Sequence, residues 1–566
     1  MAWQDTFVWW KLLLFLAVTF LLLTVAFPNN REALNIGSSG KHDKDLENWC
    51  PLPAPPNASN DGLKNSTLFS GDDALKLQIE RLSAAVNVST VSYDDNGDVE
   101  DDARWKTFGD LHVVLQRLFP LVHEKLELEK VNKYGLLYTL PGSSKELKPI
   151  LFMAHQDVVP AGDASRWTYP PFEAHYDGRW LWGRGSVDCK NNLIGLLSTM
   201  EGLLSQDYKN KRTILFSFGF DEETGGKRGA AYLAAHIEKK LGKDSVAMIM
   251  DEGGMGINTV GDVAYALPAT AEKGFLDIVI TLETPGGHSS RPPAHSAIGI
   301  MAKLISALEE NPYSPYVDSS NPFRGYLECQ AKYSPGQVES WLKKELMSSK
   351  DLGQKIAESR GDEARWSIQT SQAVDVINGG EKDNQLPDLV RTLVNYRILP
   401  TDSVDELTSS TVKILAPIAH QYSIGVEGFG SSEPRGPGGL LNLTSKDLLP
   451  PAPITSTDPS NQVWNLFAGT IRQVYESVDT LGARFVVPVG SISSGNTDTV
   501  HYWNLSKNIY RFSPRREGTT EGVHAIDERV DMGAHMEAIR LYYELIRNFD
   551  GLGENEVPRC GEEGKT

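Results

Sequence analysis

Cysteine is scarce in this chain of 566 residues. The four cysteines, Cys50, Cys189, Cys329 and Cys560, lie far apart in the sequence. This spacing excludes a disulfide-dense fold and a structural zinc site of the Cys-x-x-Cys type. Cys50 and Cys560 fall in the two flanks of the chain. They could pair with each other in an oxidising compartment, but we expect them to stay unpaired.

Positive charge is also in deficit. The chain has 55 Lys and Arg against 74 Asp and Glu, which gives a net charge of -19. A protein that binds nucleic acid needs a basic surface to neutralise phosphates, so we expect no nucleic-acid partner. The surplus carboxylates form a soluble surface or, in part, bind metal cations.

Long apolar runs are absent with one exception. Residues 12–27 are continuously apolar, which approaches the roughly 20 residues that span a bilayer. The run is either a cleaved signal peptide, with Thr24 and Ala26 at the small positions of the cleavage site, or a signal anchor, which its length favours. We therefore predict a transmembrane segment within residues 1–27 and a lumenal body. Five sequons would permit glycosylation of that body: Asn57, Asn65, Asn87, Asn442 and Asn504.

The rest of the chain divides by composition and pattern. Residues 28–66 are rich in Pro, Asn, Gly and Ser and predict a flexible stalk, and residues 551–566 predict a disordered tail. Alternating apolar runs and helical patterns predict an α/β catalytic domain, with a mostly parallel sheet flanked by helices, in two parts: 67–272 and 430–550. Residues 273–429 have a βαββαβ pattern, which predicts an inserted ferredoxin-like α+β lid domain. An irregular and helical insertion, 311–368, interrupts it.

Acids and histidines follow the predicted strands directly. Ligands gather at the carboxyl ends of the strands in such sheets, and imidazole with carboxylate suits zinc, especially where one carboxylate bridges two ions. Each residue also has an ordinary interpretation, such as a solvated pair of acids, a turn or a loop histidine, and a second His-x-Asp triplet at His175 predicts only a hairpin. The ordered set favours a site. Its members are His155, Asp157, Asp188, Glu222, Glu223, Asp251, His288 and His524.

Ten short strings carry a resemblance to a known family. They include LFMAHQDVVP, GRGSVDCKNN, FGFDEETGG, IMDEGG, GGHSSRPP, NYRILP and EGVHAIDE, and they keep one order from about residue 66 to 548. The set closely resembles the di-zinc metallopeptidase family that includes glutamate carboxypeptidase, aminoacylase and N-acyl-amino-acid hydrolases. Within that family it is most similar to the fungal vacuolar carboxypeptidases.

The resemblance implies a ligand set for two zinc ions. His155 and Asp251 would bind one ion, Glu223 and His524 the other, and Asp188 would bridge them. Cys189, which follows the bridge, is expected to be structural because the ligand set is complete without it.

The resemblance also implies the roles of the remaining residues. Asp157 would orient His155, and Glu222 would be the general base that activates a metal-bridging water. His288 would stabilise the oxyanion of the tetrahedral intermediate. Arg397 and Asn384 would hold the substrate, with Arg397 as the clamp on its carboxylate.

The predicted activity is that of a di-zinc metallocarboxypeptidase, which removes the C-terminal residue of short peptides in a lytic, vacuolar lumen. An amidase that acts on N-acyl amino acids at the same site is the alternative. A catalytically silent peptide-binding protein is a third interpretation, against which the intact base Glu222 argues. A homodimer through the lid would allow His288 to act in its own subunit or across the interface, and both remain open.

Overall fold

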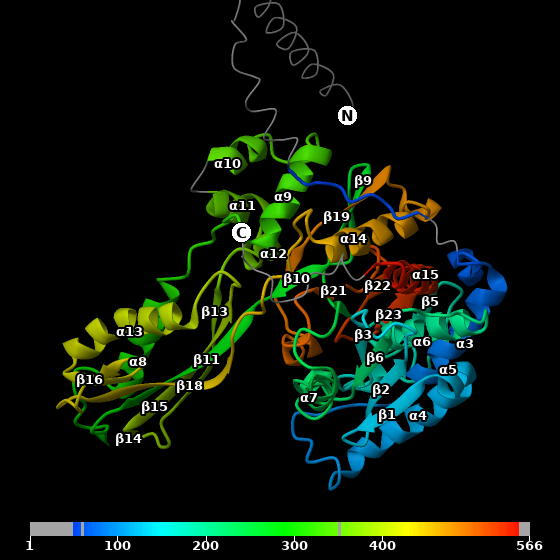
Figure 1. Ribbon diagram of the computed structural model, residues 1–566. Coiled ribbons are helices and arrows are strands. Elements are labelled where there is room, and N and C mark those ends of the chain that lie inside the picture. Colours follow the sequence, from blue (N-terminus) through cyan, green and yellow to red (C-terminus); the bar gives the residue numbers. More distant parts are fainter. Residues whose placement is uncertain (1–48, 58–60, 349–351, 554–566) are drawn as a thin grey trace, which may run out of the picture. The chain divides into compact units, whose positions relative to one another are not determined.

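Figure 1 shows the computed structural model, which describes residues 49–57, 61–348 and 352–553. The predicted transmembrane segment, the stalk up to residue 48, Cys560 and the tail from residue 554 lie outside the described residues. Within the described ranges, no helix is both long enough and apolar enough to cross a membrane.

An eight-stranded mixed sheet forms the centre of the catalytic domain. Its middle strands β6, β3 and β7 are parallel and buried along their whole length, as expected for strands covered on both faces. In spatial order the strands are β1 (Glu127–Val131), β2 (Gly135–Leu140), β6 (Ile214–Gly219), β3 (Ile150–His155), β7 (Met248–Asp251), β21 (Ile509–Arg511), β10 (Ala269–Glu272) and β20 (Ser491–Ser493).

Helices cover both faces of this sheet, as predicted. On one face the largest apolar cluster of the protein joins the strands to α6, α14 and α15 and to three helices near the N-terminal end of the described chain. On the other face α7 packs on β2 and β6. The helices are α3 (Asp72–Val86), α4 (Lys106–Leu118), α5 (Pro120–Lys125), α6 (Lys190–Leu204), α7 (Ala230–Leu241), α14 (Gln462–Tyr475) and α15 (Met532–Asp550).

The lid domain is a six-stranded sheet with two helices packed on one face. The apolar cluster between the sheet, α8 (Ala297–Glu309) and α13 (Val404–Gln421) is separate from that of the catalytic domain. The strands, in spatial order, are β13 (Ser371–Gly379), β15 (Leu389–Ile398), β11 (Gly274–Glu283), β18 (Gly439–Leu449), β16 (Ile424–Gly428) and β17 (Ser431–Ser432). The predicted βαββαβ pattern is present, but β18 extends the sheet beyond the predicted boundary at residue 429.

The helical insertion packs on strands of the catalytic part rather than on the lid sheet. Its helices share an apolar cluster with a three-stranded sheet, and Val263 and Val487 of that sheet are fully buried. The elements are α9 (Pro322–Tyr333), α10 (Leu342–Ser348), α11 (Leu352–Arg360) and α12 (Asp362–Trp366), with β19 (Phe485–Pro488), β9 (Val263–Ala266) and β8 (Ile257–Val260).

A disulfide joins Cys50 to Cys329 of α9, with Cα atoms 5.0 Å apart. The prediction that Cys50 stays unpaired is therefore wrong. Residues 49–57 also differ from the predicted flexible stalk, because Trp49 and Leu52 pack on the same apolar cluster and Tyr333 donates a hydrogen bond to the Cys50 carbonyl. Pro-rich composition alone does not reveal such contacts across the chain.

Two small sheets lie in loops that carry candidate residues. The four-stranded sheet is formed, in spatial order, by β22 (Thr520–Glu521), β23 (Arg529–Asp531), β5 (Trp180–Trp182) and β4 (His175–Tyr176). As predicted, His175 belongs to a hairpin. The second sheet pairs β12 (Gly287–His288) with β14 (Gln385–Leu386) in the lid. Six 3-10 helices complete the described elements: Ser66–Phe69, Ala103–Trp105, Ala164–Arg166, Glu222–Thr224, Asp479–Leu481 and Asp498–His501.

Candidate metal centre

Three neighbouring strands deliver polar side chains to one edge of the central sheet. His155 is the last residue of β3, Glu222 and Glu223 begin the 3-10 helix after β6, and Glu252 follows β7. Because β6, β3 and β7 are parallel, their carboxyl ends meet at this edge. The order of strands thus gathers residues from sequence positions nearly a hundred apart.

Asp188 lies between two imidazoles. Its Oδ1 is 2.9 Å from Nε2 of His155, and its Oδ2 is 3.1 Å from Nε2 of His524. Nε2 of His524 is also 3.0 Å from a carboxylate oxygen of Glu223. The two oxygens of Asp188 therefore face two different groups of ligating atoms, as a bridging carboxylate must.

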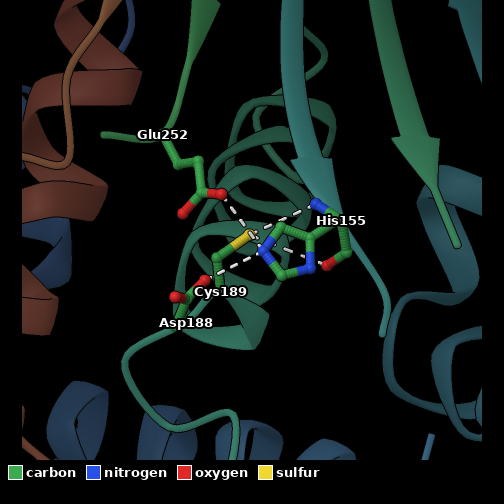
Figure 2. A group of neighbouring side chains, drawn as sticks. All are labelled: His155, Asp188, Cys189 and Glu252. Carbon is green, nitrogen blue, oxygen red and sulfur yellow. Dashed lines mark hydrogen bonds and ion pairs between the residues drawn. The ribbon is translucent and has the colours of Figure 1, made fainter. Parts of the chain in front are cut away.

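The structure places Glu252, and not Asp251, beside His155. Oε1 of Glu252 is 3.1 Å from Nε2 of His155 (Figure 2). Oδ1 of Asp251 instead accepts the backbone N–H of Glu252, and its Oδ2 is buried without a hydrogen-bond partner. Adjacent residues at a strand end point in opposite directions, so only one of the two acids can reach the centre. This corrects the sequence prediction, which assigned Asp251.

The Asp157 carboxylate connects the end of β3 to the residues that follow β6. It accepts the backbone N–H groups of Glu222 and Glu223, both at 3.1 Å, and the hydroxyl of Ser92 at 2.6 Å. Oδ1 of Asp157 also lies 3.3 Å from Nδ1 of His155. Asp157 thus contacts His155 on the side away from Asp188, as predicted for a residue that orients this ring.

Cys189 is buried beside the backbone of His155. Its sulfur accepts the backbone N–H of His155 at 3.2 Å (Figure 2). Sγ lies close enough to His155, Asp188 and Glu252 to be a potential ligand. Burial holds the pKa of the Cys189 thiol well above its usual range, and His155, Asp188 and Glu252 supply a set of three ligand groups without it.

The centre concentrates negative charge in a buried place. Burial raises the pKa of Glu223 to about 7, against the hydrogen bond from His524. Burial also holds the pKa of Glu222 well above its usual range, and the neighbouring charge of Glu252 adds to this. Hydrogen bonds to Asp188 and Glu223 raise the pKa of His524 to about 10. Such shifts mark carboxylates that lack a compensating charge.

The donor atoms fit two divalent cations. His155, Asp188 and Glu252 form one set and Asp188, Glu223 and His524 the other, with ligand atoms within 4.8 Å of one another in each set. A tetrahedral zinc holds such atoms at about 2.0–2.2 Å, so that they lie about 3.3–3.6 Å from each other. The N···O distances of 2.9 to 3.2 Å within the two sets are close to this spacing. Cations would also compensate the surplus of buried carboxylates.

The predicted lid residues fall into two places. His288 of β12 and Asn384, which precedes β14, are neighbours because the Ser289 N–H donates to the Asn384 carbonyl at 3.2 Å. His288 itself is exposed, with Nδ1 2.8 Å from Ser290 Oγ. Among the described residues, no hydrogen bond or ion pair joins the side chain of either residue to the metal centre.

Arg397 lies on β15, near the first residues of the lid domain. Its guanidinium carbon is 5.5 Å from the centre of the Phe275 ring, and Nη1 is 3.5 Å from Asn496 Oδ1. Asn496 in turn donates to the carbonyl of Lys273 at 2.7 Å. Lys273 lies directly before β11, so Arg397 contacts the point where the lid begins.

Comparison with known proteins identifies the family. The model for peptidase family M20/M25/M40 matches residues 151–548. Carboxypeptidase S of Saccharomyces cerevisiae is 40% identical over 539 residues, 92% of this chain and 92% of the relative. The N-fatty-acyl-amino acid synthase/hydrolase of Mus musculus is 29% identical over 501 residues, 87% of this chain and 92% of the relative.

A solved structure has the same fold. The M20 family metallo-carboxypeptidase Sso-CP2 from Sulfolobus solfataricus has a TM-score of 0.56 and 17% identity, over 84% of this chain and 99% of that protein. The chain therefore belongs to peptidase family M20/M25/M40 and is similar to carboxypeptidase S over most of its length. The family and the hydrolase class, predicted from the motifs, and the α/β fold with a lid, predicted from the alternation of apolar runs and helical patterns, are confirmed.

Proposed function

We propose that this protein is a metallocarboxypeptidase that hydrolyses the C-terminal peptide bond of short peptides, with two zinc ions bound at the end of β3, β6 and β7. The observation that carries the proposal is Asp188, whose two oxygens face His155 and His524. His155, Asp188 and Glu252 would hold one ion, and Asp188, Glu223 and His524 the other. When bound, the ions would supply Lewis acidity for the scissile carbonyl and the attacking water.

Glu222 is the proposed general base. Glu222 forms a group with His155 and Glu223 in which the potential ligand atoms lie within 4.8 Å of one another. The Asp157 carboxylate accepts the backbone N–H of Glu222 and so fixes its position. Glu222 takes a proton from water as the oxygen attacks the carbonyl carbon. It delivers that proton to the amine as the C–N bond breaks. A buried carboxyl suits both steps, because burial holds its pKa well above the usual range and so favours the protonated form that Glu222 must reach before it releases the proton.

Three lid residues complete the proposed reaction. His288 stabilises the developing oxyanion, and the Arg397 guanidinium pairs with the free carboxylate of the substrate. Asn384 holds the substrate beside His288, since the two segments are joined by backbone hydrogen bonding. A clamp on the terminal carboxylate explains why the enzyme would remove one residue from the C-terminal end.

Hydrolysis of N-acyl amino acids is the second candidate function, and the similarity to the mouse N-fatty-acyl-amino acid synthase/hydrolase supports it. Both substrates present an amide bond next to a free carboxylate. The purified protein should be assayed with an N-blocked dipeptide and with an N-fatty-acyl amino acid at equal concentration. Faster turnover of the dipeptide supports the carboxypeptidase, and preference for the acyl substrate refutes it in favour of the amidase.

Two measurements test the mechanism independently of substrate choice. Elemental analysis of the purified protein should find two zinc ions per chain, and Glu222→Gln should retain both while losing nearly all turnover. Glu238→Gln is a matched control, because Glu238 lies on α7, is not one of its buried residues and contacts Asn504 rather than the proposed ligands, so it should leave turnover unchanged. Full activity of Glu222→Gln would disprove the assigned base.

We also propose that the protein acts in a vacuolar lumen behind a single-pass membrane segment at residues 1–27, with release of a soluble form if that segment is cleaved. The Cys50–Cys329 disulfide supports an oxidising compartment. Treatment of membrane fractions with an endoglycosidase should lower the apparent mass if the sequons are occupied. Extraction at alkaline pH should leave the full-length chain in the membrane.

A homodimer through the lid is the proposed assembly. β13 is an edge strand of the six-stranded sheet, and Val376 and Ile377 on it are 45% and 53% exposed. Sedimentation should give twice the chain mass, and Ile377→Asp should give the monomer. Mixing inactive His288→Ala with inactive Glu222→Gln would restore activity only if His288 acts across the interface.

A further inference from the structure

Glu528 is buried between the two loops that carry Asp188 and His524. The side chain is fully buried and lies four residues after His524, just before β23. Its Oε1 accepts the backbone N–H groups of Val187 at 2.8 Å and of Asp188 at 3.1 Å. Both of its oxygens also accept the N–H of Gly185, at 3.0 and 3.1 Å. One carboxylate thus binds three backbone groups of the Asp188 loop.

Arg184, in the same loop as Asp188, adds a side-chain contact to Glu528. Its Nη1 donates to Oε2 of Glu528 at 2.6 Å, and its Nη2 donates to the Ala525 carbonyl at 3.1 Å. The Gly183 N–H also donates to the Glu528 carbonyl at 2.8 Å. Residues 183–188 and 525–528 are therefore joined by side-chain and backbone hydrogen bonds, although more than three hundred residues separate them.

This contact determines the geometry between two proposed ligands. The Asp188 carboxylate lies 3.1 Å from His524, and each is carried by a loop rather than by a strand of the central sheet. The N–H groups that a strand would pair with a neighbouring strand are instead paired with Glu528. Gly185 turns the loop with φ of 86° so that its N–H points to the carboxylate. A shift of Glu528 would move Asp188 relative to His524.

We propose that Glu528 is a positioning residue for the metal ion shared by Asp188, Glu223 and His524. It binds no ion itself, and it acts by fixing the Asp188 loop on the His524 loop. The inference rests on the proposed two-metal function. In Glu528→Gln an NH2 group replaces one acceptor oxygen, so either the N–H groups of Val187 and Asp188 or the guanidinium of Arg184 loses its acceptor. We expect the affinity for this ion to fall about 10- to 100-fold, as for other residues that orient ligands.

The test is a zinc titration of the metal-free full chain by calorimetry, with the visible spectrum of the Co²⁺-loaded protein as a second measurement. The wild type should bind two equivalents tightly. Glu528→Gln should bind at least one equivalent about 10- to 100-fold more weakly than the wild type, with an altered cobalt spectrum, because Asp188 belongs to both ligand sets. Unchanged affinity for both equivalents would overturn the proposal. A wild type that binds no metal would instead refute the proposed function.

Glu201→Gln is the matched control. The Glu201 carboxylate is also buried and accepts two backbone N–H groups, those of Leu121 at 3.1 Å and Val122 at 2.9 Å, but it lies on α6 away from the metal ligands. It should lower stability without changing zinc affinity. An equal loss of zinc affinity in both variants would mean that general destabilisation is the cause, and the proposal would fail.

Should Glu528→Gln not fold, Glu528→Asp gives the same test. The shorter side chain keeps two acceptor oxygens but cannot reach all three N–H groups. The proposal requires weaker binding of one equivalent in this variant as well, and wild-type binding of both would overturn it.

Discussion

Oδ1 of Asp157 accepts the backbone N–H of Glu222 at 3.1 Å, while the same oxygen faces Nδ1 of His155 at 3.3 Å. The proposed base and a proposed ligand are thus positioned by one buried carboxylate. In Asp157→Asn, an NH2 group would take the place of one acceptor. We expect kcat or zinc affinity to fall about 10- to 100-fold. Steady-state kinetics at saturating zinc, together with a zinc titration, measures both.

Ser92→Ala is the control for this variant, because it removes only the hydroxyl that donates to Asp157. Its effect should be several-fold smaller. An Asp157→Asn enzyme with wild-type kcat and zinc affinity would contradict the prediction.

Removal of the metal should make stability depend on pH in a defined direction. The pKa of Glu223 in the metal-free protein is raised by burial to about 7 from 4.5. A raised pKa stabilises the folded metal-free protein below pH 4.5, and this contribution is lost as the pH rises through about 7. Zinc must displace the bound proton, so the stabilisation that zinc provides should grow from about pH 5.5 to about pH 7.5.

The measurement is the rise in melting temperature on zinc addition at the two pH values. Metal-free and metal-bound protein are compared at each pH, which cancels the effect of groups that lie far from the metal. Buried His535 is such a group, and burial lowers its pKa to about 4. A zinc-induced rise that is equal at the two pH values would contradict the assignment of Glu223 as a ligand.

Arg397→Ala should weaken the recognition of a free carboxylate. A hydrogen-bonded charge pair contributes about 1.5–3 kcal/mol, so kcat/KM for a dipeptide should fall about 10- to 100-fold. The loss should be much smaller for the corresponding dipeptide amide. Arg391→Ala is a matched control, because Arg391 is six residues away on β15, faces the same side of the strand and is exposed. An equal loss for acid and amide would show that Arg397 does not bind the carboxylate.

Removal of the Cys50–Cys329 disulfide should lower stability without changing catalysis. The bridge closes 279 residues and joins residues 49–57 to α9, and a disulfide of this kind contributes about 2–5 kcal/mol. Cys50→Ser with Cys329→Ser should therefore melt at a lower temperature and keep wild-type kcat/KM. A reducing agent should lower the melting temperature of the wild type and not that of the double variant. Equal sensitivity of both to reduction would contradict the prediction.

The central fold follows from the sequence because its signals are local. β3, β6 and β7 are short apolar runs, and α6 and α7 lie between them with helical periodicity. Polar residues directly after such runs must lie at one edge of a parallel sheet. This is why the amino-acid sequence alone suffices to group His155, Glu222 and Glu223.

The features that the sequence does not reveal depend on contacts between distant segments. The choice between Asp251 and Glu252 is set by which side chain faces His155, and two adjacent acids carry no pattern that decides it. β18 lies in a stretch with Asn442 and Thr444 between leucines, and its pairing with β11 is visible only in three dimensions. The only sequence signal for Glu528 is its place in EGVHAIDE, since its partners are backbone groups of residues 185–188.

The hydrogen bonding between residues 183–188 and 525–528 has a consequence for the order in which the molecule is made. His155, Asp188, Glu222 and Glu223 are synthesised early. His524 and Glu528 come after β21 and are made much later. Until that late loop docks, the earlier segments hold an incomplete set of ligands. We therefore expect the proposed site to be inert during synthesis and to gain the ability to cut peptides only when folding is almost finished.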